Sequence, residues 1–444
     1  MPAPAIGGPR PAGRAGQRRA PPGRQSPVHL GAGMLTRRRA LAATLLIAAV
    51  GFQLRSVVLA VPPVLPTLRA DLRLSFTQAG ALTSIPVLCL GLAAVPGAFL
   101  VNRYGARSVV GLSTLGLGAT ALLRLAPPEP ATLYVFSALM ALCVAVAQPA
   151  MSVAVRVWFP DRVQQVSAVF GTALGAGGLC GATLSAGLQA LAGWRGTFVV
   201  WSTVALATGL VWLVGAPAPG AGRDPEPTGL GSALADPTAW HVAGLFGLQS
   251  LIFYGSASWI PFELRGAGPG RLSLVMLLLS LSTPPLGMLL MGLRWPWARS
   301  RAFYTVAGLL ATLGAAGFAL GLTAQAWLWA ATLGTGTAMC FLGASALPAL
   351  FARPGQVAAY AALVLTVGYA ISFVGPLLGG LLLDHTRAAT SPFWLMTAAA
   401  LALIGLGLSL PRRADGAEPA GAVHGRGPAP ATRGPGAPPD GSCR

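Results

Sequence analysis

The stretch Gly51-Phe-Gln-Leu-Arg-Ser56 lies in the middle of the first long apolar run, which extends from about residue 40 to residue 66. Arg55 is therefore a charged side chain well inside a segment long enough to cross a bilayer. An arginine near the bilayer centre costs about 3 to 17 kcal/mol, depending on the method. A chain tolerates that cost where the side chain faces a protein-lined or watery cavity. Arg55 therefore predicts an anion-binding centre inside a helical bundle.

The composition is typical of membrane proteins. The chain has 444 residues, of which 54% are hydrophobic and only 9% charged, whereas soluble domains carry about 25% charged residues. All basic residues are arginine, and the net charge of +19 is concentrated in the two polar ends of the chain. We therefore expect no nucleic-acid partner, and we expect the basic tails to meet anionic membrane lipids.

Apolar runs of about 20 residues predict twelve membrane-spanning helices. The predicted spans are residues 40–66, 76–100, 107–126, 131–156, 163–190, 195–215, 239–262, 272–293, 301–322, 326–350, 356–383 and 391–410. The predicted fold is an all-α polytopic membrane protein of two pseudo-symmetric six-helix halves. Its parts are a disordered tail at 1–38, an N-terminal half at 39–215, a linker at 216–238, a C-terminal half at 239–410 and a disordered tail at 411–444.

Arginines next to the outermost spans predict the topology. Arg37–Arg39 precede the first span, and Arg412 with Arg413 follow the last. By the positive-inside rule both ends of the chain are cytoplasmic, in a multi-pass protein of the cell (inner or plasma) membrane. A twin-arginine export signal is disfavoured because the apolar run is too long and many more spans follow. Met34 is an alternative start of the chain.

The two halves repeat each other. A shift of 196 residues places Gly51 on Gly247, Gln53 on Gln249 and Arg69 on Arg265, and a shift of 197 places Gly178 on Gly375. Leu251 falls opposite Arg55, so the halves are related but chemically unequal. Parallel six-span repeats predict a carrier whose substrate binds between the halves, near the membrane midplane.

Several short motifs along residues 40 to 410 match the sequence pattern of a known family. They are Gln53-Leu-Arg55, Leu74-Ser-Phe-Thr-Gln-Ala-Gly-Ala-Leu-Thr-Ser-Ile-Pro-Val-Leu-Cys89, Phe159-Pro-Asp-Arg162, Gly193-Trp-Arg195, Gly247-Leu-Gln-Ser-Leu-Ile-Phe-Tyr254, Trp259-Ile-Pro261, Gly368-Tyr369 and Gly375-Pro376. With them the chain resembles the major facilitator superfamily, and more closely its cyanate/nitroimidazole permease branch. The resemblance implies a secondary transporter that works by alternating access, and we expect it to act as a monomer.

One loop departs from the superfamily pattern. The loop between spans two and three usually reads Gly-x-x-x-Asp-Arg-x-Gly-Arg-Arg in that superfamily. Here Asn102 replaces the acid, while Arg103, Gly105 and Arg107 remain. The resemblance implies that these residues form a gating loop, and without the acid the inner latch is expected to be weaker or differently built.

The candidate substrate site is centred on Arg55, whose planar fork matches the oxygens of a small anion. The interiors of the predicted spans carry no Asp or Glu that could neutralise it. Tyr254 of the seventh span lies on a polar helical stripe, with Gln249 on the adjoining side. Gln148 of the fourth span and Tyr369 of the eleventh complete the predicted substrate-binding set. At the end of the eleventh span, Asp384 is expected to have a capping or surface role.

The sequence contains no nucleotide-binding loop, no metal-spaced cluster and no nucleophile motif. We therefore expect no enzyme activity, no metal and no cofactor. The predicted substrate is a small molecule, anionic or polar. Two alternatives stay open: an exporter of anionic or neutral drugs, and a non-transporting membrane receptor on the same scaffold. The exact substrate, the direction of transport and the coupling to protons also stay open.

Overall fold

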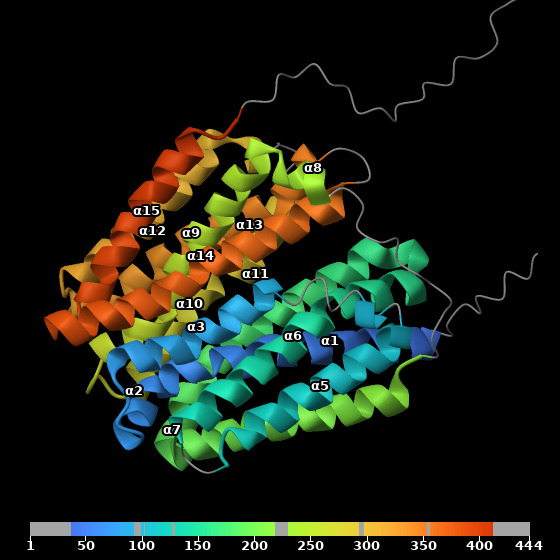
Figure 1. Ribbon diagram of the computed structural model, residues 1–444, viewed down its shortest axis with the longest axis horizontal. Coiled ribbons are helices and arrows are strands. Elements are labelled where there is room, and N and C mark those ends of the chain that lie inside the picture. Colours follow the sequence, from blue (N-terminus) through green and yellow to red (C-terminus); the bar gives the residue numbers. More distant parts are fainter. Residues whose placement is uncertain are drawn as a thin grey trace, which may run out of the picture.

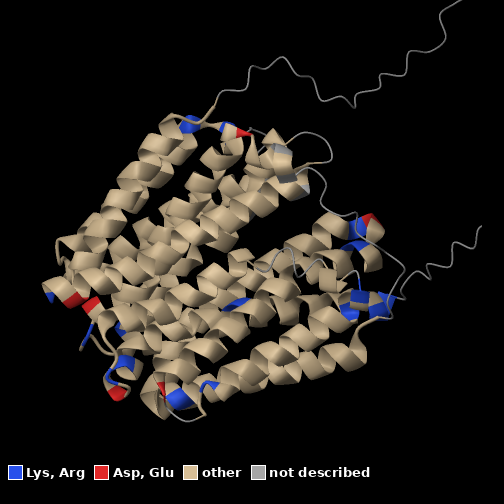
Figure 2. Ribbon diagram, viewed as in Figure 1, with Lys and Arg blue, Asp and Glu red and all other residues tan. Residues whose placement is uncertain are grey.

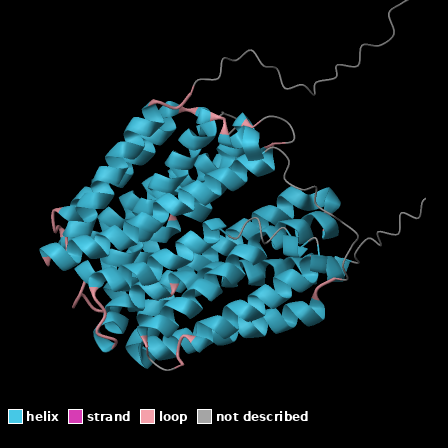
Figure 3. Ribbon diagram, viewed as in Figure 1, coloured by secondary structure: helices cyan, strands magenta, loops and turns pink. Residues whose placement is uncertain are grey.

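The computed structural model describes residues 37–92, 99–101, 103–126, 129–217, 230–292, 297–352 and 356–411. Within these residues every regular element is a helix, which confirms the all-α prediction (Figure 3). Among the described residues, eight helical segments are long and apolar enough to cross a membrane, and one of them joins α1 and α2. Almost all of the two predicted tails and most of the predicted linker lie outside the described residues.

The described helices follow the predicted spans closely. They are α1 (Arg37–Leu59), α2 (Val61–Asp71), α3 (Phe76–Leu92), α5 (Ala106–Leu123), α6 (Pro130–Trp158), α7 (Val163–Gly215), α8 (Leu230–Leu234), α9 (Pro237–Glu263), α10 (Pro269–Leu281), α11 (Thr283–Gly292), α12 (Arg301–Ala319), α13 (Ala326–Phe351), α14 (Val357–Thr386) and α15 (Ser391–Leu408). Each predicted span overlaps one of these helices or two consecutive ones.

Helix α7 contains two predicted spans. Its 53 residues would extend about 80 Å if they were straight, far more than the roughly 30 Å of a bilayer core. Gly193 interrupts it with φ +67°, a left-handed conformation that glycine adopts without a side-chain clash. The indole of Trp194 then donates to Asp71 at 2.6 Å, which ties this corner to the end of α2.

The helices pack in two groups (Figure 1). In the first group α1, α5 and α6 contact α7, and in the second α12, α13, α14 and α15 contact α9. Helices α3 and α10 lie at the boundary, where α3 packs on α14 and α10 packs on α7. Below, N-terminal half means residues 39–215 and C-terminal half means residues 239–410.

Two arginine contacts repeat between the halves. The Arg107 guanidinium donates to the carbonyl oxygen of Leu213 at 2.7 Å, and that of Arg301 donates to Leu410 at 2.8 Å. In each half the arginine begins the third span and the acceptor lies at the end of the sixth. A cation is favourable at a helix C-terminus, where carbonyl groups lack partners.

The charged residues gather at the two ends of the bundle, with a basic segment in its interior (Figure 2). We call the end that carries Arg37 and Pro411 the terminal face, and the opposite end, with Asp71, the distal face. The two groups approach each other near α2 and diverge toward the terminal face (Figure 1).

The surroundings of two glycines of α7 differ in the way that this divergence predicts. A Cβ on Gly175 would lie 3.4 Å from Pro284 of α11, across the boundary between the halves. Gly171 is one turn closer to the terminal face on the same side of α7, and among the described residues a Cβ there would meet no atom within 4 Å. The described residues of the two halves are therefore in contact at Gly175 and not at Gly171.

Candidate functional site

Arg55 lies near the midpoint of the 35-residue span formed by α1 and α2. Its side chain is half-buried, while its neighbours Leu54 and Ser56 are fully buried. Gly178 of α7 makes room for its stem, because a Cβ there would lie 3.0 Å from Cγ of Arg55. Close packing on α7 thus fixes the side of α1 from which the guanidinium projects.

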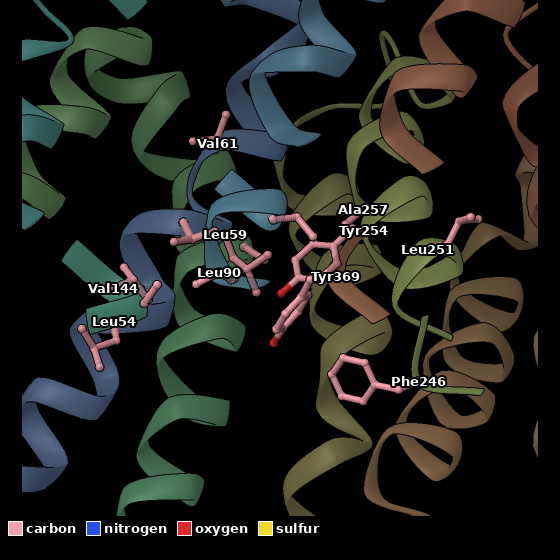
Figure 4. Close-up of a cluster of buried hydrophobic side chains, with 14 of the residues drawn as sticks. Leu54, Leu59, Val61, Leu90, Val144, Phe246, Leu251, Tyr254, Ala257 and Tyr369 are labelled. Atoms are coloured by element: carbon pink, nitrogen blue, oxygen red, sulfur yellow. The ribbon is translucent and has the colours of Figure 1, made fainter. Parts of the chain in front are cut away.

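Two tyrosines of the C-terminal half face this guanidinium. The Cζ atom of Arg55 lies 5.7 Å from the ring centroid of Tyr254 on α9. Tyr369 on α14 interacts electrostatically with the same charge. In Figure 4 both hydroxyl groups turn toward the N-terminal half. The structure therefore brings together three predicted site residues from three helices and both halves.

The buried hydroxyl of Tyr254 makes no hydrogen bond of regular geometry among the described residues, and the polar group that interacts with it there is the Arg55 guanidinium. A buried hydroxyl without a hydrogen bond costs about 1 to 3 kcal/mol, and a ligand or a water molecule that accepts from it removes that cost. This hydroxyl faces the same space as Arg55. It is therefore available to donate to an occupant of that space.

Apolar side chains surround these polar groups. The Phe246 ring meets Tyr369 edge to face at 5.3 Å between centroids, and Phe253 meets Tyr254 in the same way at 5.4 Å. On the other side lie the aliphatic side chains of the N-terminal half that Figure 4 draws, among them Leu59 and Leu90. The site thus combines one cation with two hydroxyl groups inside apolar walls.

The charge of Arg55 has no carboxylate partner among the described residues. The groups that interact with it there are Tyr254 and Tyr369. The described acids lie at helix ends or in short connections: Asp71, Glu129, Asp161, Asp236, Glu263 and Asp384. A cation enclosed by protein without a counter-ion is costly, and an anionic ligand lowers that cost.

The other two predicted site residues do not contact Arg55 in the part of the chain that the structure describes. Gln249 is buried, and its amide nitrogen donates to the hydroxyl of Ser250 at 2.5 Å. It lies about 140° around α9 from Tyr254, because each residue turns an α-helix by about 100°. Gln148 is half-buried on α6.

Sequence reasoning missed Phe246, which packs on Tyr369. An aromatic residue in an apolar span carries no sequence signal that separates a site wall from ordinary core. Its position two turns before Tyr254 on α9 becomes informative once Tyr369 is known to lie beside it.

The predicted gating loop binds to its own half where it is described. Besides the contact of Arg107 with Leu213, the indole of Trp212 donates to the Arg107 carbonyl oxygen at 2.9 Å. Gly105 has φ +78°, and the Arg103 guanidinium lies 5.4 Å from the Tyr104 ring centroid. Asn102 lies outside the described residues.

Comparison with known proteins places this architecture in a family. The family model described as Major Facilitator Superfamily matches residues 41–376. The uncharacterized transporter YycB of Bacillus subtilis (strain 168) is 25% identical over 360 residues, which cover 80% of this chain and 89% of that protein.

Two further relatives come from Escherichia coli (strain K12). The cyanate transport protein CynX is 26% identical over 345 residues, 76% of this chain and 89% of that protein. The 2-nitroimidazole transporter is 25% identical over 354 residues, 77% of this chain and 88% of that protein.

Among solved structures, a bacterial homologue of the human lysosomal transporter Spinster, in an inward-facing and unoccupied conformation, has the same fold. Its TM-score is 0.64 at 18% sequence identity, over 84% of this chain and 94% of that chain. The family match covers most of the chain, and the helices follow the spans predicted for this fold. The chain belongs to the Major Facilitator Superfamily, and it is a multi-pass membrane transporter rather than an enzyme.

Proposed function

We propose that this transporter carries a small anion, or a polar organic solute of cyanate-like or nitroimidazole-like chemistry, by alternating access. In this proposal Arg55 clamps the substrate together with Tyr254 and Tyr369. The observation that carries it is the charge of Arg55, which faces two tyrosine hydroxyls across the boundary between the halves with no carboxylate partner among the described residues.

The chemistry of the three side chains suits such a substrate. The guanidinium is always charged and offers parallel N–H donors, and each phenol offers one O–H donor. Cyanate is a small anion, and the nitro group of a 2-nitroimidazole has two acceptor oxygens on a planar ring. The names of two relatives, the cyanate transport protein and the 2-nitroimidazole transporter, favour these two chemistries.

The position of the site supports a link between binding and movement. A substrate held by Arg55 on α1 and by Tyr254 on α9 touches both halves at once. By neutralising the cation, it lowers the cost of enclosing Arg55 when the halves close over it. A ligand shifts a conformational equilibrium when it binds one state better than the other.

We further propose that the terminal face is cytoplasmic, that the protein lies in the cell membrane, and that the functional unit is a monomer. Gln148 and Gln249 are proposed as polar groups of the substrate site that lie farther from the substrate than Arg55, Tyr254 and Tyr369. The predicted gating-loop residues Asn102, Arg103, Gly105 and Arg107 are proposed to move with the N-terminal half at the terminal face.

Counterflow in proteoliposomes tests the proposal. Vesicles preloaded with unlabelled cyanate or nitrite should accumulate the labelled anion when they contain the wild-type protein. Arg55→Ala should abolish this exchange, and Arg55→Lys should reduce it strongly because an ammonium group loses the bidentate fork. The exposed arginine Arg195 provides a matched control, and Arg195→Ala should exchange normally.

Normal exchange by a well-folded Arg55→Ala would refute the role of Arg55. Ligand binding by the wild-type protein without any exchange would instead favour a receptor.

A further inference from the structure

The two halves are joined at the distal face by one carboxylate. Asp384, near the end of α14, accepts a hydrogen bond from the backbone N–H of Phe76 at 2.9 Å. Its second oxygen accepts from the backbone N–H of Thr77 at 2.7 Å and from the Thr77 hydroxyl at 2.6 Å. Phe76 and Thr77 open α3 in the N-terminal half, so all three bonds cross the boundary between the halves.

The hydrogen bonds between the Asp384 carboxylate and the first residues of α3 are stronger than those to a neutral acceptor. The first N–H groups of a helix have no partner within the helix, and the helix dipole favours a negative charge beside them. A carboxylate that accepts such donors forms shorter and stronger hydrogen bonds than a neutral acceptor does. Gly380, one turn before Asp384, leaves no space for a Cβ against the Phe76 carbonyl, which lets α14 approach α3 closely.

Two arginines hold the Phe76 ring at the same place. Cζ of Arg69, at the end of α2, lies 3.6 Å from the ring centroid, and Cζ of Arg265, just after α9, lies 5.6 Å from it. Burial and the neighbouring charge of Arg69 lower the pKa of Arg265. These two arginines occupy equivalent positions in the internal repeat. We call Asp384, Phe76, Thr77, Arg69 and Arg265 the distal clasp.

The distal clasp lies between the substrate site and the distal face. One turn beyond Tyr254 on α9, the Ser258 hydroxyl donates to the Thr83 hydroxyl of α3 at 3.0 Å, again across the boundary. Farther along α9, Trp259 and Phe262 pack on Phe76. Between the site and the distal face, the two halves are therefore joined first by the Ser258–Thr83 hydrogen bond and then by the distal clasp.

The repeat does not supply a second clasp of this kind. The alignment that pairs Gly178 with Gly375 pairs Asp384 with Gly187. The corresponding contact between α7 and α10 is a neutral hydrogen bond from the Ser273 hydroxyl to the Thr183 carbonyl oxygen at 2.9 Å. At the terminal face, the loop from Ala98 to Arg107 contains no Asp or Glu.

We infer that Asp384 is the gating residue of the transport cycle: its charge, seated on the N-terminus of α3, holds the distal face closed and favours the conformation that is open at the terminal face. This inference rests on alternating access but not on the identity of the substrate. A failure of the anion proposal would therefore leave it intact.

Thiol labelling at the two faces tests the inference without any substrate. In a cysteine-free background, Ser258→Cys reports opening of the distal face, because Ser258 is buried beneath the distal clasp. Gly171→Cys reports opening of the terminal face, because Gly171 is exposed and no described atom lies beside it. Adding Asp384→Asn in lipid nanodiscs should speed maleimide labelling at position 258 about tenfold and slow it at position 171 severalfold.

A reciprocal change distinguishes gating from simple loosening, which would speed labelling at both positions. Asp71→Asn is the matched control, because this acid also lies at the distal face but bonds Trp194 within its own half. It should alter neither rate. If the Asp384 variants do not fold, Thr77→Val should give smaller changes of the same signs. Unchanged rates, faster labelling at both positions, or the same reciprocal change with Asp71→Asn would overturn the inference.

Discussion

Replacing Tyr254 with phenylalanine should separate binding from stability. The buried Tyr254 hydroxyl makes no hydrogen bond of regular geometry among the described residues, so its removal weakens only its interaction with the Arg55 guanidinium, which keeps Tyr369. The thermal unfolding temperature of Tyr254→Phe should therefore equal or exceed that of the wild type. An anion held by Arg55 would lose one donor.

The size of the binding loss follows from the charge of the acceptor. A hydrogen bond to a charged group contributes about 1.5 to 3 kcal/mol. Each 1.4 kcal/mol corresponds to about a tenfold change in affinity. Titration of the purified protein should therefore show Kd for the transported anion rising about 10-fold to 100-fold in Tyr254→Phe.

Tyr304 provides the matched control. It is a fully buried tyrosine of α12, and its hydroxyl donates to the Ala298 carbonyl oxygen at 2.9 Å. Tyr304→Phe leaves that acceptor without its donor, so it should cost about 1 kcal/mol of stability and leave Kd unchanged. Equal Kd values for wild type and Tyr254→Phe, or a large loss of stability in Tyr254→Phe, would refute the reasoning.

Two further predictions concern packing. Gly181→Val should lower the free energy of unfolding by about 1 to 3 kcal/mol, because its Cβ would strike the Ser56 carbonyl of α1. Gly171→Val should unfold at nearly the wild-type temperature, because no described atom lies within 4 Å of a Cβ there. Equal losses of stability in both variants would contradict this interpretation. Arg107→Ala and Arg301→Ala should each cost about 1 kcal/mol in denaturant unfolding, because each removes one hydrogen bond to a helix end. An effect in only one half would argue against equivalent roles.

The fold could be predicted from the sequence because the membrane dictates it. Apolar runs of fixed length must be helices in a bilayer, so hydropathy located the spans to within a few residues. Helix breaks were harder to place. The predicted spans 163–190 and 195–215 leave a break of four residues between them, and the φ of +67° places the break at Gly193.

The site could be predicted only in part. An arginine inside an apolar run is easily recognised in a sequence, and helical spacing predicts that Tyr254 lies on a polar stripe. Spacing shows which residues share a face, but not which face meets the other half. For that reason Gln249 was grouped with Tyr254, although its amide bonds Ser250 within α9.

The helix that Asp384 caps could not be predicted from the residues next to it in the sequence. A carboxylate near the end of a span suggests capping or a surface position, and Asp384 does cap a helix. The helix is α3, whose first residues precede Asp384 by about 300 positions in the chain. Only the packing of α14 on α3 reveals that partner.

Anomalous diffraction from crystals soaked in selenocyanate tests the central claim most directly, because selenium marks a small linear anion. We predict an anomalous peak in contact with the Arg55 guanidinium, between the hydroxyls of Tyr254 and Tyr369, and no such peak in Arg55→Ala crystals. A well-occupied peak elsewhere in the bundle, with none beside Arg55, would contradict the assignment of Arg55 as the anion-binding centre.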